Sequence, residues 1–321
     1  MKILITGVSG FVGSHLAERL LKDGHRVIGL DNLQTGDRFN NRAISDSDNF
    51  SFVEGSILDF DKLEELIVGA EYIFHLAAAV GVFNIVNKPL DSLITNIKGT
   101  ENVLALAKKY SVPIFFTSSS EIYGKNTSDS LKEGDDRILG SPTTLRWSYS
   151  EAKAIDESLV HAYHVEYGLE TRIVRFFNTV GPRQLGAYGM VVPRFVQAAL
   201  DDRPITIFGT GNQTRCFAHI FDVIDAVISV AFSNSTIGKA INIGNNDEIS
   251  MNDLARLVIQ RTNSRSVVVH LPYNEAYGPG FEDMQRRVPN LDLIKELVGW
   301  TPKRNLATII DDIVLDLKSN T

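Results

Sequence analysis

The sequence predicts an α/β fold with a doubly wound parallel sheet and a smaller α+β lobe. Short apolar runs alternate with amphipathic helical windows through residues 1–178. The runs are apolar on both faces, which is typical of parallel strands covered by helices on both sides. After residue 178 this rhythm loosens, and Gly and Pro become frequent, as in GPRQLGAYG. We therefore expect one large sheet domain followed by a second lobe.

The expected strands are KILITG (2–7), RVIGLDN (26–32), NFSFVEGS (49–56), EYIFHLAA (71–78), VPIFFTSSS (112–120) and ETRIVRFFN (170–178). The expected helices are FVGSHLAERLLKDG (11–24), DKLEELIVG (61–69), LDSLITNIKGTENVLALAKKY (90–110) and YSEAKAIDESLVHAYHVEYG (149–168). We place the sheet domain at 1–178 and the second lobe at 179–321. We expect a strand near 239–243 to return to the main sheet. Ligands of such sheets bind beyond the carboxyl ends of the strands, so the second lobe would close a cleft there.

Composition excludes several classes of protein. The chain has 321 residues, of which 44% are hydrophobic and 22% charged, and its net charge is -7. This acidic balance, without clustered Lys and Arg, argues against a nucleic-acid partner. No signal-peptide pattern and no apolar stretch of membrane-spanning length is present, so we expect a cytoplasmic protein without a membrane partner. A single cysteine, Cys216, rules out an internal disulfide and gives no metal cluster, so no metal site is expected.

The motif TGVSGFVG lies where the first strand meets the first helix and contains Gly7, Gly10 and Gly13. Glycines at these points allow a tight turn and a close backbone approach to a pyrophosphate at a helix N-terminus. Asp31 ends the next strand, where a carboxylate can accept hydrogen bonds from both ribose hydroxyls but repels a 2′-phosphate. The pattern predicts a Rossmann dinucleotide site that takes NAD rather than NADP.

Tyr149 and Lys153 lie four residues apart on an expected helix, so their side chains share one face. An ammonium beside a phenol, with the positive charge of an oxidised nicotinamide ring, would lower the pKa of the tyrosine. We therefore expect Tyr149 to act as a general base and Lys153 to assist it.

These motifs together resemble the extended short-chain dehydrogenase/reductases, in the group of nucleotide-sugar epimerases, dehydratases and decarboxylases. The resemblance covers nearly the whole chain and includes TGVSGFVG, HLAA, TNIKGTENVL, TSSSEIYG, YSEAK, VRFFNTVGPR, GTGNQTRCFAHIFDV and RRVPN. It implies that Ser119 and Ser120 hydrogen-bond the sugar hydroxyl, with Tyr149 as base and Lys153 as cofactor anchor.

The resemblance also implies a set of binding residues. Members of the group often carry Gly-Asp-Ile where this chain has Gly55-Ser56-Ile57, so the adenine contact is expected from the Ser56 hydroxyl or from backbone. Asn96 would brace the active-site strand. The other expected cofactor contacts are Phe11, Val12, Asn32, Ile57, Leu76, Ala77 and Ala78. The expected contacts with the sugar nucleotide are Asn178, Val192, Arg215 and Arg287, and Arg183 could face a sugar carboxylate.

The reaction expected from the resemblance passes through a 4-keto sugar, and Glu121 bears on the fate of this intermediate. Simple 4-epimerases of the group usually have no acid at this position, whereas dehydratases and decarboxylases usually have Glu. RWSYSEAK, NQTRCF and AYGPGFEDMQRRVPN look closest to UDP-glucuronate decarboxylases, which form UDP-xylose or its 4-keto pentose. A 4-epimerase acting on UDP-glucose, UDP-glucuronate or UDP-N-acetylglucosamine is the alternative, followed by a 4,6-dehydratase. A catalytically idle regulator is the alternative from another class.

By resemblance, helices 91–109 and 149–167 would form a homodimer interface.

Overall fold

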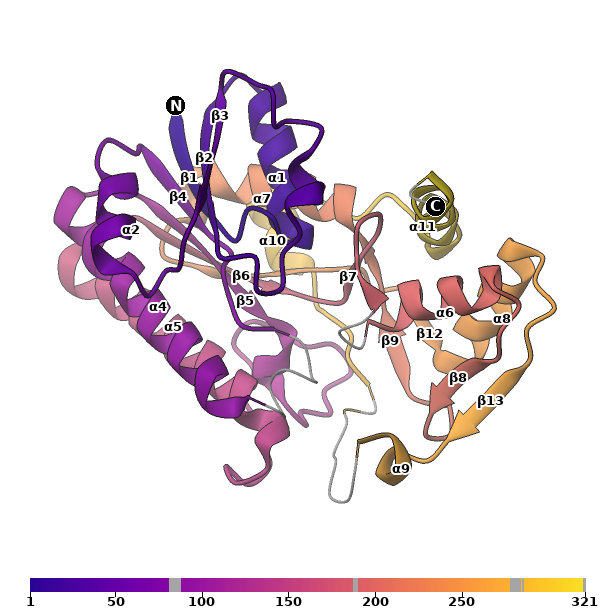
Figure 1. Cartoon of the computed structure of the whole chain (residues 1–321). Helices are drawn as coiled ribbons and strands as arrows, with labels where there is room; N and C mark the ends of the chain where they lie inside the picture. The colour runs from indigo at the N-terminus through magenta and orange to yellow at the C-terminus, as the bar shows by residue number, and fades with distance from the viewer. Residues whose placement is uncertain (81–87, 187–189, 278–283, 285, 320–321) are drawn as a thin grey trace.

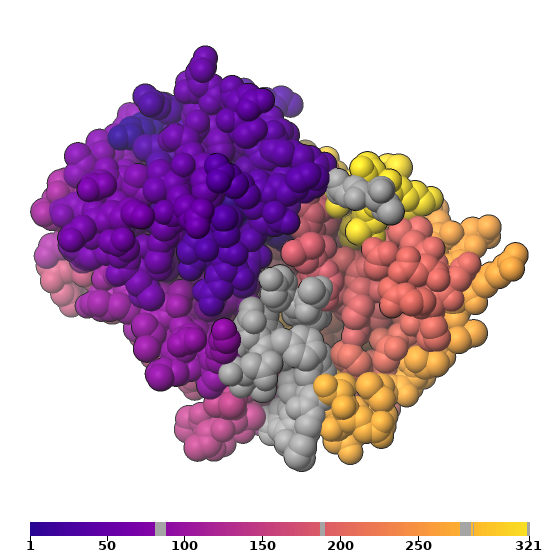
Figure 2. All heavy atoms as spheres, in the orientation of Figure 1, coloured from indigo at the N-terminus to yellow at the C-terminus, as the bar shows by residue number. Residues whose placement is uncertain are grey.

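The computed structural model describes residues 1–80, 88–186, 190–277, 284 and 286–319. The middle of the segment AYGPGFEDMQRRVPN, which contributes to the family resemblance, lies outside the described residues. The sheet domain and the second lobe stand side by side (Figure 1), and Figure 2 shows one face of the molecule with both lobes. Within the described ranges, no helix has the length and apolar character needed to cross a bilayer.

Seven parallel strands form the central sheet in the order β11-β6-β5-β4-β1-β2-β3, which confirms the predicted doubly wound α/β fold. The strands are β1 (Lys2–Thr6), β2 (Arg26–Asp31), β3 (Phe50–Glu54), β4 (Tyr72–His75), β5 (Ile114–Ser119), β6 (Thr171–Phe176) and β11 (Ala240–Ile243). The late strand β11 pairs with β6 at the edge of this sheet. The division of the chain between 178 and 179 stays a prediction.

Alternating side chains of each strand enter two separate cores. Ile3 and Ile5 of β1 pack toward one face, and Leu4 packs toward the other. The first face is covered by α1 (Phe11–Lys22), α7 (Ile220–Ala231) and α10 (Asp292–Val298). The second face is covered by α2 (Phe60–Ile67), α4 (Pro89–Tyr110) and α5 (Ser148–Tyr167). Both faces of the strands are therefore apolar, as the sequence indicates.

The second lobe has its own core, formed by one face of each of three helices and a short strand. The helices are α6 (Val191–Leu200), α8 (Met251–Thr262) and α11 (Leu306–Ser319), and a short helix α9 (Tyr273–Tyr277) lies nearby. Small two-stranded sheets complete it: β8 (Ile205–Phe208) with β13 (Val268–Leu271), β9 (Thr214–Cys216) with β12 (Glu248–Ser250), and β7 (Thr179–Val180) with β10 (Ala218–His219). This confirms the predicted smaller α+β lobe.

The chain reverses its direction of winding between β1 and β4, which are neighbours in the sheet although β2 and β3 come between them in sequence. A crevice opens at such a switch point because the connections leave the carboxyl ends of the two strands in opposite directions. The first glycine motif follows β1, and the Leu-Ala-Ala segment follows β4. The fold therefore directs both motifs to one edge of the sheet.

Candidate active site

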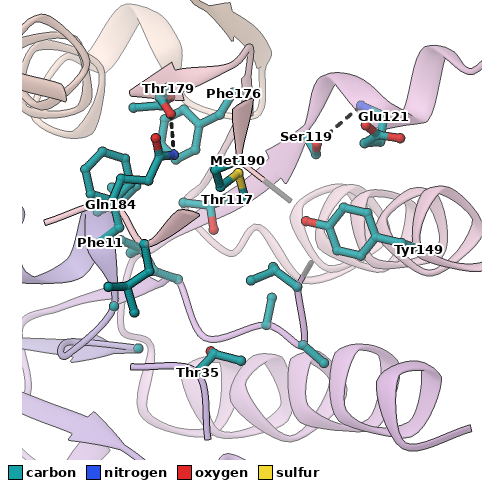
Figure 3. Close-up of a pocket in the computed structure, with 18 of the residues that line it drawn as sticks. Phe11, Thr35, Thr117, Ser119, Glu121, Tyr149, Phe176, Thr179, Gln184 and Met190 are labelled. Carbon is teal, nitrogen blue, oxygen red and sulfur yellow. Dashed lines mark hydrogen bonds between the residues drawn. The ribbon is translucent and has the colours of Figure 1, made fainter. Parts of the chain in front are cut away.

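A cavity of about 680 Å³ extends from the carboxyl ends of the strands to the second lobe. Its walls include most of the residues singled out in the sequence. These are Gly7, Gly10, Phe11, Val12, Gly13, Asp31, Asn32, Ser56, Ile57, Leu76, Ala77, Ala78, Ser119, Ser120, Glu121, Tyr149, Lys153, Asn178, Arg183, Arg215 and Arg287. Asn96 and Val192 are not among the cavity walls. Figure 3 shows Phe11 and Thr35 across the cavity from Ser119 and Glu121.

The glycine motif forms a cradle that a side chain would fill. Gly7 has a φ of 78°, which favours glycine, and a Cβ on Gly13 would lie 2.1 Å from the carbonyl oxygen of Gly7. The motif leads into α1, whose first turn presents backbone N–H groups and contains no acidic residue. This geometry fits a pyrophosphate.

Asp31 is buried at the end of β2, beside this cradle. Its carboxylate accepts hydrogen bonds from the backbone N–H groups of Ser9 (2.9 Å) and Leu33 (2.8 Å). Burial raises the pKa of this carboxyl, and the two backbone donors oppose the shift. The group is thus fixed at the cavity wall, where a ribose hydroxyl can reach it.

The segment after β4 is held by side chains behind the cavity. Asn96 is buried on α4, and its side-chain amide makes two hydrogen bonds with the backbone of Ala79. It accepts from the Ala79 N–H at 2.8 Å and donates to the Ala79 carbonyl at 3.3 Å. Asn96 therefore acts on the cofactor site through the backbone that follows Ala78. The hydroxyl of Ser56 accepts the backbone N–H of Leu58 at 3.1 Å, as a turn residue does.

The segment TSSSEIYG covers the end of β5 and the turn of 3-10 helix that follows it at Ser120–Tyr123. The hydroxyl of Ser119 accepts the backbone N–H of Glu121 at 3.2 Å (Figure 3). The hydroxyl of Ser150, on α5, donates to the carbonyl of Glu121 at 2.8 Å. These bonds fix Glu121 at the cavity wall.

Two arginines converge on the Glu121 carboxylate. Arg146 Nη1 lies 2.6 Å from one carboxylate oxygen, and Arg287 Nη2 lies 2.7 Å from the other. Arg287 also donates to the Ser120 hydroxyl at 3.3 Å. Burial alone would raise the pKa of Glu121, but the charges of Arg146 and Arg287 outweigh it and hold that pKa far below its usual range. Glu121 is therefore ionised at neutral pH.

Tyr149 lies in the first turn of α5, and its hydroxyl points into the cavity near Ser119 (Figure 3). Its pKa is raised by burial and by the negative charges of Glu121 and Asp156, while the Ser119 hydroxyl opposes the rise. The lowered pKa expected from the sequence includes the positive charge of a bound oxidised nicotinamide, so it stays a prediction for the cofactor-bound protein.

Lys153 lies one turn further along α5 and is almost fully buried. Its ammonium donates to the carbonyl of Thr117 at 3.0 Å and lies over the ring of Phe116, 4.6 Å from the centroid. Burial lowers the pKa of Lys153, and the carboxylates of Asp156 and Glu157 oppose this. Tyr149 and Lys153 both line the cavity, as their spacing on one helix predicts.

On the side of the second lobe, Asn178 and Arg215 line the cavity. The Asn178 amide donates to the carbonyl of Cys216 at 2.8 Å, and Arg215 donates to the carbonyl of Thr214, also at 2.8 Å. Val192 differs from the prediction: its side chain is fully buried in the core of the lobe, because α6 turns that face inward. Its neighbour Val191 lines the cavity instead.

The contact of Arg183 with a sugar carboxylate stays a prediction, and in this structure its side chain contacts α1. Its guanidinium binds α1, with Glu18 Oε1 at 2.7 Å and the Ser14 hydroxyl at 3.3 Å, and the carbonyl of Asn40 at 3.3 Å. Ser14 directly follows the glycine cradle, so Arg183 lies on the cofactor side of the cavity.

Arg146 is the site residue that the sequence reasoning missed. It precedes Tyr149 by three positions in RWSYSEAK, a segment already noted for its resemblance to decarboxylases. That position was the available signal. Arg287, by contrast, was predicted to hold a nucleotide diphosphate, whereas here its guanidinium binds Glu121 and Ser120.

The parallel sheet, the glycine cradle, the half-buried Tyr149 and the buried Lys153 define a dinucleotide-dependent enzyme. Residues 3–244 match the model of the NAD dependent epimerase/dehydratase family, and the chain belongs to this family, within the extended short-chain dehydrogenase/reductases. NAD is its cofactor, and the glycine cradle and Asp31 fit that dinucleotide.

Three relatives illustrate the similarity. The UDP-N-acetyl-alpha-D-glucosaminuronate decarboxylase of Bacillus cytotoxicus is 39% identical, over 94% of this chain and 92% of that protein. The UDP-glucuronic acid decarboxylase 1 of Xenopus tropicalis is 36% identical, over 94% of this chain and 68% of that protein. Among solved structures, the UDP-glucuronic acid 4-epimerase of Bacillus cereus, in complex with UDP-glucuronic acid and NAD, has a TM-score of 0.89 at 28% identity and covers 100% of both chains.

Proposed function

We propose that the protein is a decarboxylase of a UDP-linked uronate, either UDP-glucuronate or its 2-acetamido counterpart. The observation that carries this proposal is the convergence of Arg146 and Arg287 on Glu121 at the end of β5, beside Ser119 and Tyr149. Guanidinium groups at this point attract an anionic group on the sugar. The two decarboxylase relatives support the same reaction class.

The chemistry begins at the sugar C4 hydroxyl. Tyr149 accepts the proton of this hydroxyl, and the Ser119 hydroxyl hydrogen-bonds the same oxygen. NAD, held by the glycine cradle and Asp31, would supply the oxidising power for removal of a hydride from C4. The C4 carbonyl then stands β to the C6 carboxylate.

Decarboxylation results from that arrangement. The C5–C6 bond breaks, carbon dioxide leaves, and the electron pair moves into the C4 carbonyl to give an enolate. Tyr149, now protonated, and Ser119 donate hydrogen bonds to the enolate oxygen. Glu121 is ionised, so as placed it orients Arg146 and Arg287 rather than donating a proton. A proton from solvent water at C5 gives the 4-keto pentose, and return of the hydride to C4 with the Tyr149 proton to the C4 oxygen would give the pentose.

A second candidate is 4-epimerisation of a UDP-uronate, because it needs the same Tyr149 and Ser119 and because the Bacillus cereus neighbour is such an enzyme. Glu121 favours decarboxylation, since simple 4-epimerases of the group usually have no acid at this position. A 4,6-dehydratase is disfavoured because Ser120 stands where some dehydratases carry an acid for the leaving hydroxyl.

The experiment is incubation of the protein with UDP-glucuronate, UDP-N-acetylglucosaminuronate, UDP-glucose and UDP-N-acetylglucosamine, followed by mass analysis of the products. Release of carbon dioxide from either uronate supports the proposal. A product of unchanged mass with a new configuration at C4 would establish the epimerase instead, and loss of water would establish a dehydratase. Turnover of none of the four would favour the idle regulator.

A further inference from the structure

A buried carboxylate lies directly behind the Tyr149 and Lys153 pair. Asp156 follows Lys153 by three positions on α5, and its Oδ2 lies 3.8 Å from Lys153 Nζ. The Lys153 side chain is 3% exposed and that of Asp156 is 0% exposed. Charges this far from water need a partner, because neither is solvated.

Asp156 is the carboxylate placed to be that partner. Among the described residues, it alone lies in ion-pair contact with Lys153. The next acid on the helix, Glu157, is engaged elsewhere, since its carboxylate binds the guanidinium of Arg175 at 2.7 and 3.0 Å. The carbonyl of Thr117 and the ring of Phe116 contact the ammonium but carry no compensating charge.

The carboxylate itself is held by few groups. Both oxygens of Asp156 are buried, and among the described residues the Thr100 hydroxyl is the group placed to hydrogen-bond them. Burial raises the pKa of Asp156 to about 6, while the charge of Lys153 and the hydroxyl of Thr100 oppose the rise. A buried carboxylate with so few hydrogen-bond donors around it calls for a functional reason.

A line of polar groups runs from the cofactor side of the cavity to Asp156. The N–H of Ala77 donates to the hydroxyl of Thr6 at 3.2 Å, and this hydroxyl lies 2.7 Å from His75 Nδ1. His75 Nε2 lies 3.2 Å from the hydroxyl of Thr100, which faces Asp156 from α4.

The donor and acceptor roles along this line of hydrogen bonds depend on which ring nitrogen of His75 carries the proton. If Thr6 donates to His75 Nδ1, then Nε2 carries the proton and donates to Thr100, whose own proton is left for the carboxylate. The opposite tautomer would turn the Thr100 proton toward the imidazole. Burial lowers the pKa of His75 to about 3, so the ring is neutral and the line can keep this direction.

We propose that Asp156 is a positioning residue that keeps Lys153 charged and aimed at the cavity, with Thr100 and His75 directing a proton toward its carboxylate. The proposal deepens the function proposed above and rests on the role given there to the Tyr149 and Lys153 pair, but not on which sugar reacts. The charged or titratable groups around the ammonium are Asp156 and Glu157 on α5 and His75 on β4.

The test measures the protonation of Lys153 directly. Protein labelled with carbon-13 at the lysine Cε is titrated by NMR, and the Lys153 signal is assigned by its loss in Lys153→Met. The variants are Asp156→Asn, Thr100→Val and, as a hydroxyl-preserving control, Thr100→Ser. Ser158→Ala is the matched control on α5, since its hydroxyl donates only to the helix carbonyl of Ala154.

We expect the Lys153 titration to move at least one pH unit lower in Asp156→Asn and a smaller amount in the same direction in Thr100→Val. Thr100→Ser and Ser158→Ala should titrate as the wild type does. The alkaline limb of kcat/KM against pH should move with the NMR midpoint. An unchanged Lys153 midpoint in Asp156→Asn would overturn the proposal, whatever its thermal stability. If Asp156→Asn does not fold, an unchanged midpoint in Thr100→Val would overturn it.

This readout separates the proposal from the proposed function. The NMR titration needs no substrate, so a protein that turns over neither uronate can still show the shift. Conversely, decarboxylation with an unmoved Lys153 midpoint would leave the proposed function intact and refute the role of Asp156.

Discussion

The carboxylate of Glu121 lies 2.7 Å from the guanidinium of Arg287, and this contact joins the end of the central sheet to a segment near the other end of the chain. Arg146 binds the second oxygen of the same carboxylate at 2.6 Å. The acid at the end of β5 is thus the group that orients two cations at the cavity wall.

We expect Glu121→Gln to lower decarboxylation by about a hundredfold or more, because the two guanidiniums lose the charge that orients them. Oxidation at C4 uses Tyr149 and Ser119, so it should continue. Reduced nicotinamide should therefore accumulate on mixing with UDP-uronate, measured by its absorbance beside product mass.

The matched control is Glu151→Gln, an acid on the same helix as Tyr149 whose carboxylate lies 3.6 Å from Arg137. It should behave as the wild type does. Thermal unfolding of both variants checks that the buried arginines have not destabilised the fold. Unimpaired turnover in Glu121→Gln would show that the acid only caps the end of the strand.

Gly13→Ala should abolish cofactor binding and destabilise the protein by about 1–3 kcal/mol. A Cβ at this position meets the Gly7 carbonyl oxygen at 2.1 Å, a backbone atom that cannot move aside cheaply. The control is Gly134→Ala, where a Cβ meets nothing within 4 Å. Titration of protein fluorescence with NADH and urea unfolding measure the two effects, and equal behaviour of the two variants would contradict the cradle.

His75 should make the protein less stable as the pH falls from 6.5 toward 3. Its pKa is lowered from 6.5 to about 3 by burial and by the charge of Lys153, so the unfolded chain binds a proton that the folded chain does not. The loss amounts to at most about 4 kcal/mol. Asp156 has the opposite slope, since its raised pKa gives stability at low pH that is lost as the pH rises through about 6.

The two slopes are separated by comparison with His75→Gln. The difference in unfolding free energy between wild type and variant, measured in urea across this pH range, isolates the histidine. Parallel curves would show that His75 does not titrate differently in the folded and unfolded states.

The dimer predicted through helices 91–109 and 149–167 has a test on the same two helices. Ile94 on α4 is 47% exposed and Ile155 on α5 is 44% exposed, and α4 and α5 pack side by side. Replacing both by Glu should give a monomer in sedimentation velocity, where the wild type sediments as a dimer. Leu315→Glu, on α11 of the second lobe and 65% exposed, should leave the dimer intact. A wild-type monomer at micromolar concentration would refute the interface.

The amino-acid sequence alone predicts the doubly wound sheet, the second lobe, the cofactor cradle and the shared face of Tyr149 and Lys153. These features depend on short-range patterns: the period of apolar residues, glycines in one turn, and a spacing of four on a helix. Each of these patterns spans only a few residues, so it can be recognised without knowledge of the rest of the chain.

Which polar groups contact each other follows from the folding of the whole chain. It brought Arg146 and Arg287 to Glu121, turned Arg183 toward α1, buried Val192 in the second lobe, and placed Asp156 behind Lys153. Except for Asp156 and Lys153, these contacts join segments far apart in sequence, and even that pair matters because both groups are buried. Burial and long-range packing set the strength of the interaction between two charges and the direction of each pKa shift. The spacing of residues in the sequence predicts neither.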